Sequence, residues 1–119
     1  MPLDEAAACD HHRRVTARQD LERIFRAGVV ACHPARAIPA HLPEPPKGRA
    51  FVLAVGKAAW GMAQAVEENW RGPLTGLVVV PRGTAEPLER IEVATADHPV
   101  PDEASVTAAQ RLLVIAEEA

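Results

Sequence analysis

The sequence predicts an α/β fold, in which helices cover both faces of a short, mostly parallel sheet to give three layers. Two segments, residues 51–55 and 76–80, are continuous apolar runs, typical of parallel strands that are buried on both faces. A helix-forming segment, residues 57–70, lies between them, so the three predict a βαβ unit with a right-handed crossover. Apolar residues make up 48% of the 119 residues and aromatic residues only 3%, so the core must consist mainly of small and branched aliphatic side chains.

The first predicted helix follows a polar N-terminal segment, residues 1–15, which we expect to be a flexible leader. Thr16 and Gln19 match the capping-box pattern of a helix start. His33, which precedes a proline, is disfavoured in helical geometry and marks the end. One face of this helix is apolar and should be buried; it consists of Leu21, Ile24, Phe25, Gly28, Val29 and Cys32.

Residues 34–49 contain five prolines and predict an irregular connector rather than regular structure. Farther along, residues 91–95 alternate like a third strand near an edge of the sheet, and Asp102 is a good N-cap for a last helix. Only three strands are visible, although a sheet that is buried on both faces normally has more. The sequence therefore predicts a partial Rossmann-like domain, an incomplete fragment of a larger fold.

Composition and charge exclude several classes of protein. The net charge is −3, so the chain has no overall basic footprint for nucleic acid. No apolar run reaches the roughly 18–20 residues that span a membrane, and the first fifteen residues do not resemble a secretory signal. Two cysteines, Cys9 and Cys32, are too few for a disulfide scaffold, which favours a cytoplasmic location. We expect Cys32 to be a small buried hydrophobe.

The strongest candidate for chemistry is the turn after the first strand, Gly56-Lys57-Ala58. Ligands of open α/β sheets bind at the carboxyl ends of the strands, and a helix N-terminus there offers N–H groups to an anion. Gly56 lets the backbone approach a ligand and Lys57 adds a cation in the first helical turn, so the turn fits a carboxylate or a phosphate. A lysine that snorkels at the surface of a tight turn fits the same spacing equally well.

Two common nucleotide-binding motifs fail at this turn. A P-loop needs a glycine where Phe51 stands and a serine or threonine where Ala58 stands. The dinucleotide fingerprint G-x-G-x-x-G needs its second glycine at Ala58. The sequence therefore does not favour a nicotinamide site.

A second candidate is the segment of residues 97–102, Asp-His-Pro-Val-Pro-Asp, which follows the third strand. His98 has a side chain that can bind a substrate or transfer a proton near neutral pH. A proline-stiffened turn in which Asp102 caps a helix explains the same residues, and the residues alone favour that interpretation. No positioned serine or cysteine completes a catalytic triad with Asp97 and His98.

Five pieces of the chain, in order, resemble the N-terminal part of the glycerate 2-kinase family, also called MOFRL-type glycerate kinases or hydroxypyruvate reductases. These pieces are residues 21–25 with 33–36, 55–59 with 62–63, 76–79, 87–93 and 98–102. The resemblance implies that residues 16–119 form the N-terminal part of a glycerate kinase α/β domain. In this chain, residues 81–85 stand where family members usually carry a Tyr-Gly-His-like stretch.

The resemblance also implies an activity, the transfer of the ATP γ-phosphoryl group to D-glycerate with Mg²⁺ to give 2-phosphoglycerate. It implies a catalytic role for Lys57 at the substrate or the transferring group, and substrate binding by Gly56, Lys57, Ala58 and His98. The family's Ser- and Gly-rich phosphate-binding loop, which would hold ATP and Mg²⁺, is absent from this chain. We therefore expect the 119-residue chain alone to have no kinase activity.

Two alternatives remain open. One is a non-catalytic module that binds an anion or a sugar phosphate through the Gly56-Lys57 turn. The other is a hydroxypyruvate reductase, a name that the family also carries. The expected partner is a small molecule, glycerate, rather than a nucleic acid or a membrane. Self-association through exposed apolar sheet surface is also expected.

Overall fold

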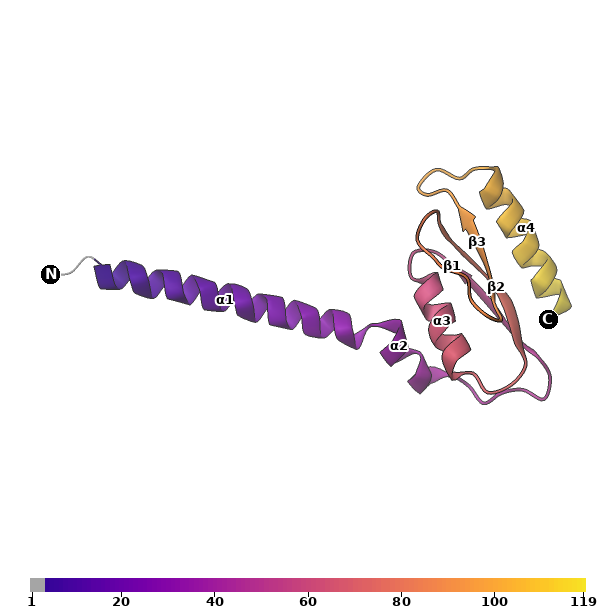
Figure 1. Cartoon of the computed structure of the whole chain (residues 1–119), viewed down its shortest axis with the longest axis horizontal. Coiled ribbons are helices and arrows are strands. Elements are labelled where there is room, and N and C mark those ends of the chain that lie inside the picture. The colour runs from indigo at the N-terminus through magenta and orange to yellow at the C-terminus, as the bar shows by residue number, and fades with distance from the viewer. Residues whose placement is uncertain (1–3) are drawn as a thin grey trace.

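The computed structural model describes the backbone of residues 4–119 and the side chains from residue 16 onward. A three-stranded sheet lies between helices, and a long N-terminal helix extends away from this body (Figure 1). The Cα radius of gyration is 22.1 Å, well above the roughly 13 Å of a compact chain of this length. The elements are α1 (Asp4–Ala31), α2 (Pro34–Ala37), η1 (Pro39–His41), β1 (Ala50–Val55), α3 (Ala59–Asn69), β2 (Leu74–Pro81), β3 (Glu92–Ala96) and α4 (Glu103–Glu118).

The predicted parallel sheet is confirmed. The strand order is β1-β2-β3 and both pairs are parallel, with Val52 opposite Gly76 and Leu77 opposite Glu92. The central strand β2 is buried along most of its length, as its continuous apolar sequence predicts. In sequence order, this is the arrangement of the first three strands of a Rossmann fold.

The two faces of the sheet hold separate apolar cores. On one face, Val78 and Val80 pack with Ala59 and Ala63 of α3. On the other face, Leu77 and Val79 belong to a core that includes the buried Ala108 of α4, and Leu112 and Ile115 pack against it. Because neighbouring residues of β2 point to opposite faces, a single strand anchors both helices. These two cores hold α3 and α4 in place on opposite faces of the sheet, and so set their positions relative to the carboxyl ends of the strands.

The edge strand β1 departs from the prediction. Its continuous apolar sequence predicts burial on both faces, but Leu53 and Val55 are 42% and 68% exposed. Both side chains lie on the α4 face, because their register partners Leu77 and Val79 do. α4 contacts all three strands and β3 most of all, so it leaves these two side chains of the edge strand accessible to solvent.

The connection from β2 to β3 is short and contains no helix, yet it joins parallel strands. It lies on the α3 face, where Leu88 packs against the core and the indole N–H of Trp60 donates to the Glu86 carbonyl at 2.8 Å. The carboxylate of Glu67 in α3 accepts the backbone N–H groups of residues 89, 90 and 91 at 2.9, 2.6 and 3.0 Å. One acidic side chain therefore binds the loop that takes the place of a crossover helix.

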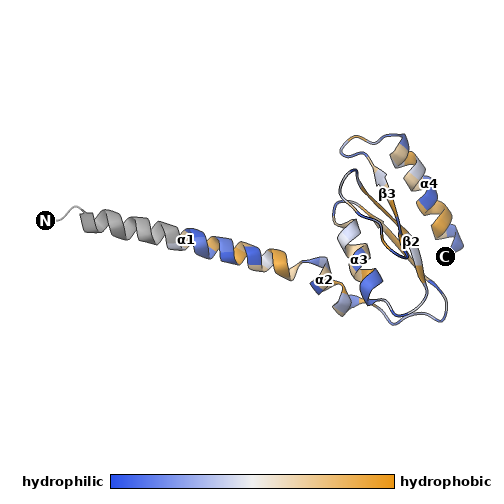
Figure 2. Cartoon of the chain, viewed as in Figure 1, coloured by the Kyte–Doolittle hydropathy of each residue, from blue (hydrophilic) through white to orange (hydrophobic). Residues whose placement is uncertain are grey.

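The N-terminal helix differs from the prediction in both length and burial. α1 begins at Asp4, so most of the segment that we expected as a leader is helical, and Thr16 lies inside the helix. The alanines at positions 6–8 have the highest helix propensity and favour this extension. The predicted apolar face is also not buried: Phe25 is 71% exposed and Cys32 is an exposed free thiol. In the part of α1 that Figure 2 colours, the most hydrophobic residues gather at the end nearest α2.

The proline-rich connector also contains more structure than the prediction allows. Pro34 begins the four-residue helix α2, and His33 caps that helix by accepting the Ala35 N–H at its Nδ1 atom. Proline is well suited to the first position of a helix, because it lacks only an N–H that would be unbonded there. The prediction of wholly irregular structure for residues 34–49 is therefore wrong for α2 and η1.

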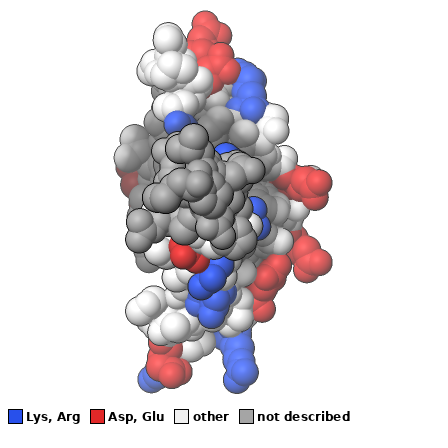
Figure 3. Space-filling view, turned by 90° about the vertical axis from the view of Figure 1, so that its left-hand side faces the viewer, with Lys and Arg blue, Asp and Glu red and all other residues white. Residues whose placement is uncertain are grey.

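The surface charges and the helices of the described residues have two further features. On the face shown in Figure 3, blue and red side chains of the described residues are interspersed rather than gathered by sign. Among the described residues, no helix combines the length and the apolar character that crossing a membrane requires.

Candidate functional site

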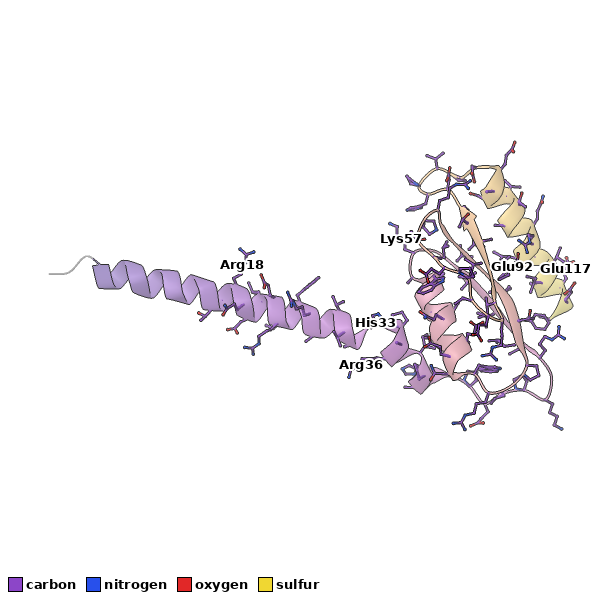
Figure 4. All side chains as sticks on the ribbon, in the orientation of Figure 1. Arg18, His33, Arg36, Lys57, Glu92 and Glu117 are labelled. Carbon is purple, nitrogen blue, oxygen red and sulfur yellow. The ribbon has the colours of Figure 1, made fainter. Side chains whose placement is uncertain are left out.

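The turn after β1 has a backbone conformation that lets a ligand approach the main chain closely. Gly56 has φ +116°, a value that residues with a side chain rarely adopt. Its N–H donates to the Val79 carbonyl at 3.0 Å, and its own carbonyl accepts the Ala59 N–H at 3.2 Å. These bonds hold Lys57 in a tight turn at the carboxyl end of the sheet, where its side chain is exposed (Figure 4).

Lys57 precedes α3, although the sequence places it in the first helical turn. The helix begins at Ala59, and Ala58 occupies the N-cap position. The positive φ of Gly56 is not helical, so the helix cannot start before the turn is complete. Alanine cannot cap a helix with its side chain, so this N-terminus keeps its capacity to bind an anion through backbone N–H groups.

The structure brings three of the four predicted site residues to one cavity. Gly56, Lys57 and His98 all line a cavity of about 550 Å³ at the carboxyl ends of the strands, beside α4. Its volume lies within the range of small-molecule sites. Ala58 does not line the cavity. The proximity of the Gly56-Lys57 turn and His98 follows from the parallel strands, whose carboxyl ends share one edge.

The walls of this cavity are mainly apolar. Side chains from all three strands and from α4 contribute to them, whereas Lys57, Asp97, His98 and Ser105 are the polar residues of the lining. Such a site can orient a small ligand through a few polar groups while the apolar walls exclude water. The apolar wall residues include Val55, Val79, Ala96, Ala108 and Leu112.

An ion-pair cluster that the sequence reasoning missed lies beside the cavity. Arg82 follows β2, and its Nε donates to Asp97 Oδ1 at 2.5 Å while its Nη2 donates to Asp102 Oδ2 at 2.6 Å. The two hydrogen bonds and the two negative charges raise the pKa of Arg82. Arg82 therefore binds both ends of the segment that carries His98. Opposite charges at the carboxyl ends of the neighbouring strands β2 and β3 were the signal that could have revealed this cluster.

The capping role of Asp102 is confirmed in full. Its carboxylate accepts the Ser105 N–H at 3.0 Å, and the Ser105 hydroxyl accepts the Asp102 N–H at 3.1 Å, which completes a capping box. The backbone N–H of Ser105, followed by Arg82, lowers the pKa of Asp102 to about 2. The carboxylate form is thus the one that α4 and Arg82 bind.

This lowered pKa predicts a loss of stability in acid. An aspartate in the unfolded chain titrates near 3.9, so the contribution of Asp102 is complete above about pH 4 and disappears as the pH falls toward 2. Asp102→Asn keeps a capping oxygen but cannot titrate. We expect the free energy of unfolding of the variant to vary less with pH between 4 and 2, as measured by urea denaturation at several pH values. An identical pH dependence in both proteins would contradict the role of Asp102.

The described residues do not fit a bound Mg²⁺. No cluster of three or more His, Cys, Asp or Glu side chains occurs between residues 16 and 119. Asp97 lines the cavity, but Arg82 binds its carboxylate, as it does that of Asp102. We therefore assign no contact with Mg²⁺ or ATP to these residues.

The chain is similar to a known protein family and to several known proteins. Residues 20–119 match a family model described as a domain of unknown function, DUF4147. A protein of Agrobacterium vitis named "Putative hydroxypyruvate reductase" is 48% identical over 99 residues, which are 82% of this chain and 23% of that protein. A D-glycerate 2-kinase of Thermotoga maritima is 36% identical over 97 residues, which are 80% of this chain and 23% of the kinase.

Solved structures show the same fold. The crystal structure of the glycerate kinase from Thermotoga maritima matches with a TM-score of 0.71 and 33% identity, over 84% of this chain and 25% of that one. A protein from Pyrococcus horikoshii OT3 matches with the same TM-score and 31% identity, over 87% of this chain and 26% of that one. This chain therefore spans about a quarter of the length of the relatives it matches.

Proposed function

Since the chain belongs to the DUF4147 family and corresponds to the N-terminal part of the glycerate 2-kinases, we propose that it supplies the substrate-binding part of a glycerate kinase site. The single observation that carries this proposal is the shared cavity of the Gly56-Lys57 turn and His98. Glycerate carries one carboxylate and two hydroxyl groups. A cation, backbone N–H groups and an imidazole are suitable partners for these groups.

Lys57 has the proposed catalytic role. In phosphoryl transfer from ATP to a glycerate hydroxyl, the transferring group carries negative charge on its equatorial oxygens. A lysine ammonium stabilises that charge where it develops, which is the main electrostatic task in such a reaction. The Gly56 turn holds the backbone of Lys57 in place through its hydrogen bonds to Val79 and Ala59.

We propose that His98 positions the substrate from the opposite side of β2. His98 follows β3 and Lys57 follows β1, so the two residues lie on either side of the central strand and line one cavity. Arg82 orients the segment that carries His98 by binding Asp97 and Asp102. Ala58, which does not line the cavity, contributes through its place at the N-terminus of α3.

ATP would supply the phosphoryl group and Mg²⁺ would neutralise its negative charge. The residues described here do not form a site for either. The proposal is therefore a substrate half-site, and we expect the 119-residue chain alone to transfer no phosphoryl group. ATP-dependent phosphorylation of D-glycerate by the purified chain would contradict this part of the proposal.

Separate calorimetric titrations with D-glycerate, inorganic phosphate, ATP and NADH test the proposed site. We expect D-glycerate to bind and NADH not to bind, because the turn lacks the dinucleotide fingerprint. Binding of phosphate without D-glycerate would favour a non-catalytic anion module, and binding of NADH would favour a reductase. Either result would reject the kinase half-site.

A further inference from the structure

Most of the wall of the cavity beside Lys57 has no partner in the proposed function. Glycerate is a three-carbon acid with a hydroxyl group on each carbon outside the carboxylate, so it has no apolar portion. The cavity has a volume of about 550 Å³, and cavities of this size accommodate drug-sized ligands. Glycerate at Lys57 would therefore fill only a part of the cavity and would leave most of the apolar wall uncovered.

On the side of the sheet, the apolar wall comes from the carboxyl ends of all three strands. Val55 of β1, Val79 of β2 and Ala96 of β3 line the cavity. Val79 and Ala96 belong to the core beneath α4, and Val55 is the register partner of Val79, so its side chain lies on the same face. Val55 is nevertheless 68% exposed. A ligand that covers this valine removes apolar surface from water, which is favourable.

On the side of the helix, small residues of α4 leave room above the strands. Ser105, Ala108 and Ala109 line the cavity and belong to the N-terminal half of α4. Leu112 and Ile115, about one and two turns farther along, pack against the core. The large side chains therefore hold the C-terminal half of α4 against the sheet, and the small ones leave a gap at the carboxyl ends of the strands.

Lys57 adds a cation to these apolar walls. Its ammonium group forms no ion pair with another described residue. The other titratable residues of the lining are His98 and Asp97, and Arg82 pairs with the Asp97 carboxylate. The lining thus combines one unpaired cation with a mainly apolar wall. A molecule that complements it has a single negative charge and an apolar body.

We propose that this cavity binds aliphatic monocarboxylic acids, with the carboxylate at the Lys57 ammonium group and the alkyl chain against the apolar wall of β2 and α4. The inference shares one element with the proposed function and rests on it to that extent, namely the role of Lys57 as the cation that binds a carboxylate. It does not depend on phosphoryl transfer. It adds an apolar subsite beside that cation and a class of ligand that fills it.

The proposed subsite predicts how affinity depends on the length of the alkyl chain. Burial of one methylene group contributes about 0.8 kcal/mol, which corresponds to a change in affinity of about fourfold. An acid whose chain lies against the apolar wall gains this contribution with each added methylene until the cavity is full. An acid that is held by its carboxylate alone, with its chain in solvent, gains nothing.

NMR titrations of the 119-residue chain with propionate, butyrate, pentanoate, hexanoate and D-glycerate test this dependence. We expect the dissociation constant to fall about fourfold with each methylene from propionate to hexanoate. Equal affinities for all four alkyl acids would overturn the proposal. In the complex with hexanoate, nuclear Overhauser contacts should join the alkyl protons to the methyl groups of Val55, Val79 and Leu112. Hexanoate that binds without these contacts would also overturn it.

A variant that fills the cavity tests the position of the alkyl chain. Ala109 is exposed and lines the cavity, so Ala109→Trp adds bulk there without displacing a buried side chain. Ala116→Trp is the matched control, because Ala116 is exposed about two turns farther along the same side of α4 and does not line the cavity. We expect the Ala109→Trp chain to bind hexanoate at least tenfold more weakly than the Ala116→Trp chain. Equal affinities would overturn the proposal.

The same experiments distinguish other occupants of the cavity. A self-associated 119-residue chain that becomes monomeric with Ala109→Trp would place a second copy in the cavity and overturn the proposal. The polypeptide of the Agrobacterium vitis relative outside its matched region, fused after Ala119, would do so if the fusion no longer bound hexanoate, because that polypeptide would then fill the cavity.

Failure of this inference and failure of the proposed function give different results. Binding of D-glycerate without any dependence of affinity on chain length among the alkyl acids would reject the apolar subsite and leave the proposed function supported. Tighter binding of longer acids without any binding of D-glycerate would reject the proposed function and leave the subsite supported. If neither D-glycerate nor any of the alkyl acids bound, both would be rejected.

Discussion

Replacing Lys57 with methionine is expected to weaken the binding of D-glycerate or inorganic phosphate by tenfold to a hundredfold. Methionine keeps the length and apolar stem of the side chain but removes the ammonium group. A hydrogen bond to a charged group contributes about 1.5–3 kcal/mol, and each 1.4 kcal/mol corresponds to a tenfold change in affinity. The exposed side chain of Lys57 makes no hydrogen bond or ion pair whose loss would unfold the described part of the chain.

The chain offers a matched control for this experiment. Lys47→Met makes the same chemical change in the exposed connector before β1 and does not touch the cavity. Calorimetry should give an unchanged dissociation constant for Lys47→Met and a weakened one for Lys57→Met. Equal affinities in the two variants would show that Lys57 is a surface lysine at a tight turn, which the sequence alone allows equally well.

Replacing Gly76 with alanine is expected to cause the largest loss of stability. A Cβ atom at this position would lie 2.0 Å from the carbonyl oxygen of Val52, its register partner in β1. The obstacle is backbone rather than a flexible side chain, so β1 and β2 would have to separate. Overpacking of a rigid core costs typically 1–3 kcal/mol and sometimes more, and we expect a loss of about 3 kcal/mol or more by urea denaturation.

Gly48→Ala is the control for this substitution. A Cβ atom at Gly48 would meet no other atom within 4 Å, and the backbone there does not require a glycine. Its replacement should leave the free energy of unfolding unchanged or slightly higher, because alanine restricts the unfolded chain. If Gly76→Ala were as stable as Gly48→Ala, the close contact between β1 and β2 would be wrong.

The sequence predicts the body of this protein well because local pattern and tertiary structure agree there. Continuous apolar runs predict β1 and β2, and Asp102 correctly predicts the start of α4. The shared position of Lys57 and His98 also follows, since parallel strands bring their carboxyl ends together. These features depend on periodicity and connectivity, which a single sequence contains.

The features that the sequence does not predict depend on what each element packs against. The apolar face of α1 is indistinguishable in sequence from a buried face, and only the structure shows that Phe25 and Cys32 are exposed. Likewise, nothing in the β1 sequence reveals that one of its edges is free. The Arg82 cluster depends on the distance between two loops, so opposite charges in the sequence suggest it only after the strand order is known.

The helix-free connection between β2 and β3 has a consequence for how this fold tolerates change. A crossover helix forms its own backbone hydrogen bonds, so its length and sequence can change. This loop instead relies on the two carboxylate oxygens of Glu67 as acceptors for three backbone N–H groups. Insertions between residues 82 and 84, which are exposed, can bulge outward without disturbing that contact. Insertions between residues 88 and 91 shift the three N–H groups out of register with Glu67. The spacing from residue 89 to β3 is therefore the part of the connection with the least freedom to vary in length.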